Sequence, residues 1–262
     1  MTAKSGQWDD LLVRLSSGGV IAGVGLLSVW LGGVWFLALT VIVAAVMIWE
    51  LARMLDAEAP ALALAGVAGV ALLIAELVPS GFALPLIVAP ALVGFGQLSR
   101  HRTLFTVFSL SVLLAAFGLY VLRQDFGFTW IAWLVIVVAA TDIFGYFAGR
   151  FIGGPKFWPR VSPKKTWSGT AAGWIAAAVV GLAFLGATGA GWELIGVSIA
   201  ISMASQIGDI AESAVKRRVG VKDSSSLLPG HGGLFDRFDG MLGASIFLLI
   251  VGQIVDFPPG LA

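Results

Sequence analysis

The sequence has no cysteine among its 262 residues, and only 12% of its residues are charged. Without cysteine, the chain cannot form disulfides, thiolate nucleophiles or zinc sites built on thiolates. The charged fraction is about half of the roughly 25% found in soluble domains, whereas 58% of the residues are hydrophobic. This composition excludes an ordinary soluble domain. The net charge of +1 carries no information by itself, and we expect no nucleic-acid partner.

Apolar runs close to the ~20 residues needed to cross a bilayer recur along the whole chain. The runs are continuously apolar and do not alternate, so a transmembrane β-barrel is not expected. The sequence predicts an all-α polytopic membrane protein, a single domain over 1–262 in which 1–140 form N-terminal helices and 141–256 carry the polar motifs. The nine expected spans are 18–33, 34–49, 61–78, 82–98, 104–122, 129–149, 168–186, 192–210 and 241–256.

The lysines and arginines are distributed unevenly between the loops that join these spans. If the N-terminus is cytoplasmic, the N-terminal lead and the loops at 50–60, 100–103, 150–167 and 211–240 are cytoplasmic too. These regions hold fifteen of the sixteen Lys and Arg residues, and only Arg123 lies outside them. The positive-inside rule therefore predicts a cytoplasmic N-terminus and nine crossings. We expect an inner (plasma) membrane protein with its polar loops facing the cytoplasm.

One polar stretch, residues 206–240, stands out from this apolar background. Besides His231, it contains the acidic residues Asp209, Glu212, Asp223, Asp236 and Asp239 and the basic residues Lys216, Arg217, Arg218, Lys222 and Arg237. Membrane topology alone would account for the basic run 216–218 but not for the carboxylates beside it. Carboxylates can hold a divalent cation, and basic side chains can bind phosphate oxygens. The stretch therefore predicts a phosphoryl- or nucleotidyl-transfer site.

Two acidic residues lie on the expected helices themselves. Asp142 interrupts an apolar run about eight residues from its cytoplasmic end, which is a depth of ~12 Å at the α-helical rise. An ionisable group at that depth is expensive and marks a function by default; a structural pair with a lysine or arginine of another helix is the alternative. Asp209 closes another run, and a continuing helix would place it on the same face as Glu212.

The residues from Ser213 to Asp239 resemble the signature of the phosphatidate cytidylyltransferase (CDP-diacylglycerol synthase) family, S-x-x-K-R, then K-D, then P-G-H-G-G-x-x-D-R-x-D. The matching positions are Ser213, Lys216, Arg217, Lys222, Asp223, Pro229 to Gly233, Asp236, Arg237 and Asp239. Two upstream pieces are also similar to the family, the run from Asp142 to Arg150 and the S-P-K-K-T-W run at 162–167. Two positions depart from it, Ser168 in place of an acidic residue and Gly145 in place of alanine.

The resemblance implies an enzyme that condenses CTP with phosphatidic acid in the bilayer to give CDP-diacylglycerol and pyrophosphate. It implies an essential Mg²⁺ between Asp209 and Asp236, with Asp239 as a nearby ligand and Asp142 serving a second cation or the nucleotide. The full set of implied catalytic residues is Asp209, Asp236, Asp239, Lys222, Asp223 and His231, and that of the substrate-binding residues is Asp142, Lys164, Lys165, Ser213, Lys216, Arg217, Arg237, Gly232 and Gly233. For His231 we favour a hydrogen-bonding role over a general base, because a phosphomonoester is already anionic near neutral pH.

Other functions remain open at this point. The lipid substrate could be an ether-lipid or polyprenyl phosphate, because only the reaction centre is written in the motif. A CDP-alcohol phosphotransferase is disfavoured because its D-G-x-x-A-R pattern is missing. A cation-coupled transporter would place Asp142 and Asp209 midway across the membrane, but it does not need the dense polar loop. The glycine-rich helices are compatible with a homodimer.

Overall fold

The structure is a computed structural model that describes residues 5–228, 230–254 and 257–258. Pro229, the first residue of the predicted P-G-H-G-G turn, lies outside these residues, as do residues 255 and 256 at the end of the last expected span.

Within the described residues the chain forms nine α-helices, and each expected span coincides with one of them. The helices are α1 (Ser5–Leu31), α2 (Gly33–Leu55), α3 (Ala61–Leu77), α4 (Ala83–Gln97), α5 (Arg102–Phe126), α6 (Phe128–Phe151), α7 (Trp167–Thr188), α8 (Glu193–Val219) and α9 (Phe235–Ile254), with a 3₁₀ turn, η1 (Ser80–Phe82), before α4. In this described part, α2, α5, α6, α7 and α8 are long and apolar enough to cross a bilayer. The protein is an all-α multi-pass membrane protein, and the number of crossings and their direction stay predictions.

Three local features differ from the sequence-based expectations. The charged segment 50–60, expected as a loop, is helical as far as Leu55, because α2 continues beyond its apolar run. The expected loop 150–166 contains an antiparallel hairpin of β1 (Lys156–Trp158) and β2 (Ser162–Thr166). Helix α8 continues through the first part of the polar stretch to Val219, which confirms that Asp209 and Glu212 lie on one continuous helix.

The chain divides into two compact units. The first unit comprises Met1–Leu113 and Val219–Phe238, and the second comprises Leu114–Arg218 and Asp239–Ala262. The polar stretch is therefore shared between the units. The part that loops between α8 and α9 packs with the N-terminal helices, whereas the flanking parts of α8 and α9 belong to the second unit.

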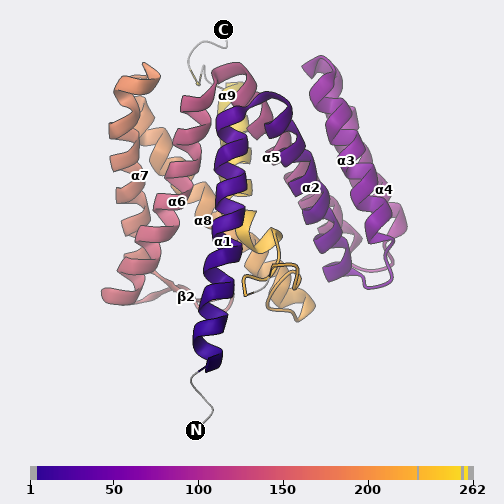
Figure 1. The fold of residues 1–262 in the computed structure, drawn as a ribbon, viewed down its shortest axis with the longest axis horizontal. Coiled ribbons are helices and arrows are strands. Elements are labelled where there is room, and N and C mark those ends of the chain that lie inside the picture. Colours follow the sequence, from indigo (N-terminus) through magenta and orange to yellow (C-terminus); the bar gives the residue numbers. More distant parts are fainter. Residues whose placement is uncertain (1–4, 229, 255–256, 259–262) are drawn as a thin grey trace. The chain divides into compact units, whose positions relative to one another are not determined.

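In the first unit, α2 packs against α3 and α3 against α4, so that the three helices lie side by side (Figure 1). Ile48, Leu51, Leu72 and Ile87 are almost fully buried between them. Asp56, which follows α2, ties this end together by accepting hydrogen bonds from the hydroxyl and amide of Ser99, at 2.6 and 2.8 Å. These bonds lower the pKa of Asp56 from 3.8 to about 2.

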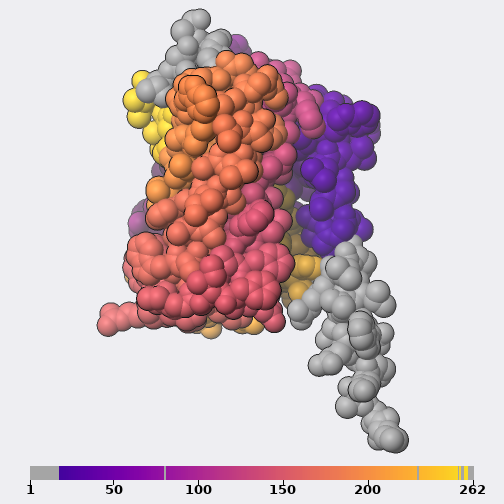
Figure 2. Space-filling view, turned by 90° about the vertical axis from the view of Figure 1, so that its left-hand side faces the viewer, coloured from indigo at the N-terminus to yellow at the C-terminus, as the bar shows by residue number. Residues whose placement is uncertain are grey.

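In the second unit, α6 packs along α7, and glycines allow the close approach. A side chain at Gly169 would collide with the carbonyl oxygen of Gly145, so the two backbones touch, as is common between membrane helices. Helix α7 lies on the face that Figure 2 shows (orange). Its residues Ile175 and Val179 are 67% and 60% exposed. An apolar surface of this kind is what a lipid-facing helix requires.

Candidate active site

Helices α8 and α9 approach each other so closely that only glycine fits where they touch. A Cβ atom at Gly208 of α8 would clash with the carbonyl oxygen of Asp239 and would approach the backbone of Gly243. A Cβ atom at Gly243 would in turn meet the carbonyl oxygen of Ala204. This contact holds the part of α9 that starts at Asp239 against the part of α8 that carries the acidic residues, and both parts belong to the second unit.

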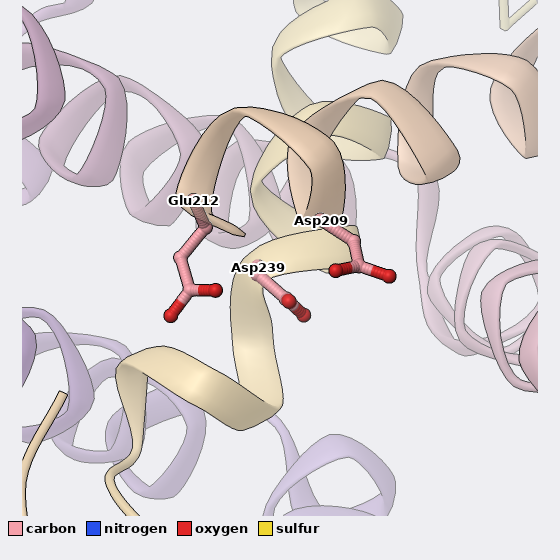
Figure 3. Close-up of side chains that lie close together, drawn as sticks. All are labelled: Asp209, Glu212 and Asp239. Atoms are coloured by element: carbon pink, nitrogen blue, oxygen red, sulfur yellow. The ribbon is translucent and has the colours of Figure 1, made fainter. Parts of the chain in front are cut away.

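Three carboxylates meet there, namely Asp209 and Glu212 of α8 and Asp239 of α9 (Figure 3). One oxygen from each lies within 4.8 Å of the others. Glu212 is 1% exposed, and Asp209 and Asp239 are half-buried. Carboxylates this close repel one another strongly in a partly buried site, so the cluster is suited to a cation.

Two lysines of the same unit offset part of this negative charge. The Nζ of Lys165, on β2, lies 2.5 Å from Oδ2 of Asp209. The Nζ of Lys216 lies 2.6 Å from Oε2 of Glu212, one helical turn away. Three carboxylates therefore face two ammonium groups.

Other predicted residues of the second unit surround this cluster. Asp142 lies on α6 with an exposed side chain, and its negative charge acts on Asp239 together with that of Asp209. The hydroxyl of Ser213 donates to Oδ1 of Asp209 at 3.4 Å. Lys164 on β2 and Arg217 near the end of α8 are exposed. The structure thus brings Asp209 and Asp239 together with Glu212, and Asp142 is near enough for its charge to act on Asp239.

Asp236 belongs to the first unit, where it organises the loop that precedes α9. Its Oδ2 accepts hydrogen bonds from the amide and hydroxyl of Ser224, both at 2.9 Å, and from the amide of Gly233 at 2.7 Å. An acidic residue in the first turn of a helix is also favoured by the helix dipole. The structure therefore gives one oxygen of Asp236 a role in the loop, and its predicted role as a Mg²⁺ ligand stays a prediction.

The glycines of the motif are required by this loop. Gly232 has a φ of +82°, a backbone conformation that favours glycine, and a Cβ atom there would approach Oδ2 of Asp236. At Gly233 a Cβ atom would meet the hydroxyl of Ser224 and a carboxylate oxygen of Glu50. His231 is half-buried beside Gly18 of α1. The remaining predicted residues of the loop, Lys222, Asp223 and Arg237, are exposed.

Glu50 is the residue of this loop's surroundings that the sequence analysis missed. It lies near the end of α2, is 0% exposed, and accepts hydrogen bonds from the amides of Leu234 and Phe235 at 3.0 and 2.7 Å. With Trp49, Arg53 and the loop residues 224–227 it lines a cavity of about 590 Å³ in the first unit. The available signal was a carboxylate at the end of an apolar run. Because residues 50–60 were expected to form a charged loop, Glu50 was interpreted as an ordinary loop residue.

The donor set of the second unit fits a hard divalent cation. Mg²⁺ binds through one or two carboxylates and completes its shell with water and phosphate oxygens. Asp209, Glu212 and Asp239 supply oxygens close enough together to share such an ion, and the adjacent lysines suit a phosphate group. The donor set thus has the chemistry that a divalent cation with a bound phosphate group would require.

Comparison with known proteins agrees with this chemistry. The model of the cytidylyltransferase family matches residues 12–255. A phosphatidate cytidylyltransferase of Brucella abortus (biovar 1, strain 9-941) is 51% identical over 148 residues, which cover 55% of each chain. Proteins of the same name from Helicobacter pylori (strain ATCC 700392 / 26695) and from Staphylococcus saprophyticus are 41% identical over 137 residues and 39% identical over 160 residues, covering 51% and 58% of this chain and 50% and 61% of theirs.

The chain thus spans about half the length of the curated relatives that it matches. The family model, in contrast, covers nearly all of the chain, including the N-terminal helices and the polar stretch. The chain belongs to the cytidylyltransferase family.

Proposed function

We propose that the protein is a phosphatidate cytidylyltransferase of phospholipid biosynthesis. A phosphate oxygen of phosphatidic acid attacks the α-phosphorus of CTP, the bond from that phosphorus to the β-phosphate oxygen breaks, and pyrophosphate leaves. CDP-diacylglycerol remains in the bilayer. The observation that carries this proposal is the cluster of Asp209, Glu212 and Asp239 beside Lys165 and Lys216, in a chain of this family.

The two substrates are both polyanions and repel each other, and the residues of the cluster can reduce this repulsion. Asp209, Glu212 and Asp239 would hold Mg²⁺, which supplies positive charge to phosphate oxygens in phosphoryl transfer. Lys165 and Lys216 can turn from their carboxylate partners to the substrate phosphates when these arrive. Catalysis of this kind depends mainly on positioning and charge neutralisation.

The nucleophile needs little help from a base. A phosphomonoester has a second pKa of about 6 and is largely dianionic at neutral pH. His231 therefore orients a ligand through a hydrogen bond, and Lys222, Asp223 and Arg237 bind or position substrate phosphates, as the family motif implies. Asp142 serves a second cation or the nucleotide.

The location proposed for the reaction is the cytoplasmic face of the inner membrane. The distribution of Lys and Arg supports nine crossings with a cytoplasmic N-terminus, since fifteen of the sixteen cations then lie inside. CTP would come from the cytoplasm, and the two-chain lipid would come sideways from the bilayer. A homodimer stays a prediction.

The experiment incubates detergent-solubilised protein with CTP labelled at the α-phosphate, phosphatidic acid and Mg²⁺, and measures label extracted into organic solvent. We expect lipid-soluble label only when all three are present, and its loss in Asp209→Asn. The matched control is Asp125→Asn, since Asp125 is exposed at the end of α5. Label that persists in Asp209→Asn, or that enters a polyprenyl or ether-lipid phosphate but never phosphatidic acid, would refute the proposal.

A further inference from the structure

Glu50 is placed and buried in a way that its position in an apolar helix does not explain. Its carboxylate is fully enclosed and accepts hydrogen bonds from the hydroxyl of Ser225 at 2.6 Å and from the amides of Leu234 and Phe235. The hydroxyl of Ser224 lies at the limit of hydrogen bonding, 3.5 Å away. These donors come from the loop before α9 and from the first residue of α9, more than 170 positions further along the chain.

A buried carboxylate is an expensive way to hold a loop. Burial removes the charge from water, and only several well-placed donors can offset that cost. The loop supplies such donors, and it also has glycine at position 233, where any Cβ atom would strike a carboxylate oxygen of Glu50. The side chain of Glu50 and the loop are therefore complementary in shape and hydrogen bonding. If position 50 only had to fill space, an apolar side chain would suffice.

The bonds from Glu50 fix the point at which α9 begins. Leu234 is the residue before α9 and Phe235 is its first residue, and amides at this end of a helix have no partner within the helix itself. The next residue, Asp236, is bound by Ser224 and Gly233, and Ser224 and Ser225 adjoin Glu50. Glu50 and Asp236 thus both accept hydrogen bonds from the same loop.

We propose that Glu50 is the positioning residue of the loop between α8 and α9. Through this loop, Glu50 sets the positions of Asp236 and of the phosphate-binding residues beside it. The effect on catalysis rests on the proposed function, whereas the effect on the loop does not. Since a displacement of about 1 Å in a transfer site can reduce the rate about 100-fold, loosening the loop should reduce turnover far more than it reduces folding.

The test compares wild type with Glu50→Gln, which keeps the shape and one acceptor oxygen, and with Glu50→Ala. Hydrogen exchange of the segment 222–238 is measured by mass spectrometry, alongside kcat and KM for CTP and the melting temperature. We expect exchange in this segment to quicken at least about 10-fold and kcat to fall about 10-fold in Glu50→Gln and about 100-fold in Glu50→Ala, with KM changed less than threefold.

The matched control is Glu76→Gln, because Glu76 is another glutamate of the N-terminal helices and its side chain accepts a bond from Thr40 instead of the loop. Its loop exchange and kcat should equal those of the wild type. A double variant of Glu50→Gln with Ser225→Ala should be no slower than the poorer single variant, because both break one contact.

Unchanged exchange of segment 222–238 in Glu50→Gln would overturn the inference, and so would faster exchange with an unchanged kcat. If the wild type itself transferred no label to lipid, the proposed function would fail, and the exchange measurement would still decide whether Glu50 holds the loop.

Discussion

Replacing Asp239 by asparagine should make the protein more stable without Mg²⁺ and inactive with it. Asparagine has the same shape and keeps an oxygen that can accept the 2.7 Å hydrogen bond from the amide of Gly240. The substitution therefore removes the negative charge that Asp239 carries when it is ionised, and little else. A residue kept at the expense of stability is typical of a functional site.

The size of the effect follows from the separation of the carboxylates. Two unit charges no more than 4.8 Å apart repel by at least about 3.5 kcal/mol at an effective dielectric constant of about 20. Asp239 has two such neighbours, Asp209 and Glu212, whose charges are partly offset by Lys165 and Lys216. We expect a net gain of about 1–3 kcal/mol in the metal-free variant, or about 2–4 °C in melting temperature for each kcal/mol.

The assay is thermal unfolding of the detergent-solubilised protein with EDTA and with increasing Mg²⁺. In the wild type a Mg²⁺ concentration of 100 times Kd should stabilise the fold by about 2.7 kcal/mol. In Asp239→Asn this stabilisation should shrink or vanish, and transfer of label to lipid should fall at least about 100-fold, as expected when charge neutralisation in the site is lost. Asp125→Asn should behave as the wild type in both measurements.

The reasoning would be refuted by a variant that melts below the wild type in EDTA and gains as much stability from Mg²⁺. That result would mean that Asp239 is held by favourable contacts and takes no part in binding a cation. Loss of activity alone would not distinguish the two cases, and for this reason the unfolding curves are the primary measurement.

Three further predictions test other parts of the structure. Gly208→Ala should lower the melting temperature by the equivalent of about 1–3 kcal/mol through overpacking against α9, and it should abolish transfer. Gly196→Ala on the same helix, with open space around it, should be neutral or slightly stabilising, and equal effects of the two variants would contradict the close contact. Lys165→Gln should raise KM for CTP about 10-fold, as expected for loss of a charge-assisted phosphate contact, and Lys156→Gln on the exposed strand β1 should not; an unchanged KM would exclude Lys165 as a phosphate ligand. The carboxylate of Asp56 has its pKa lowered to about 2, so its stabilising effect is complete above pH 3.8 and is lost as the pH falls toward 2. The melting temperature of Asp56→Asn should therefore lie below that of the wild type at pH 7 and converge with it near pH 2. A constant difference between the two melting temperatures would contradict this account.

The helices were predictable because membrane spanning imposes a simple rule on sequence. A span must be apolar for about twenty residues, and each of the nine expected segments coincides with a helix of the described chain. The ends were less predictable, since charged residues can extend a helix beyond the apolar run. Helix α2 continues to Leu55 in this way, and α8 continues to Val219.

The acidic cluster was predictable only in part. Helical spacing placed Asp209 and Glu212 on one face, and the continuous helix α8 confirms this. What the sequence could not provide is the distance between α8 and α9. That distance depends on the contact between Gly208 and Gly243, and glycines are too frequent in this chain, with 34 in all, for one pair to stand out. The meeting of Asp239 with Glu212 follows from that contact.

The loop between α8 and α9 depends for its order on N-terminal helices that contain no motif residue. Its described residues, 220–228 and 230–234, form no helix or strand beyond one bridge between Leu228 and Gly232. Fixing each backbone residue costs roughly 1–2 kcal/mol, so a segment of this kind needs outside anchors to stay ordered. Two of these lie in the first unit, Glu50 of α2 with its hydrogen bonds and Phe108 of α5, whose ring lies 6.2 Å from that of the fully buried Phe235. The N-terminal helices are therefore part of the structure that orders the motif, which is the physical reason to expect substitutions far from the motif in sequence, such as those at Glu50, to act on it.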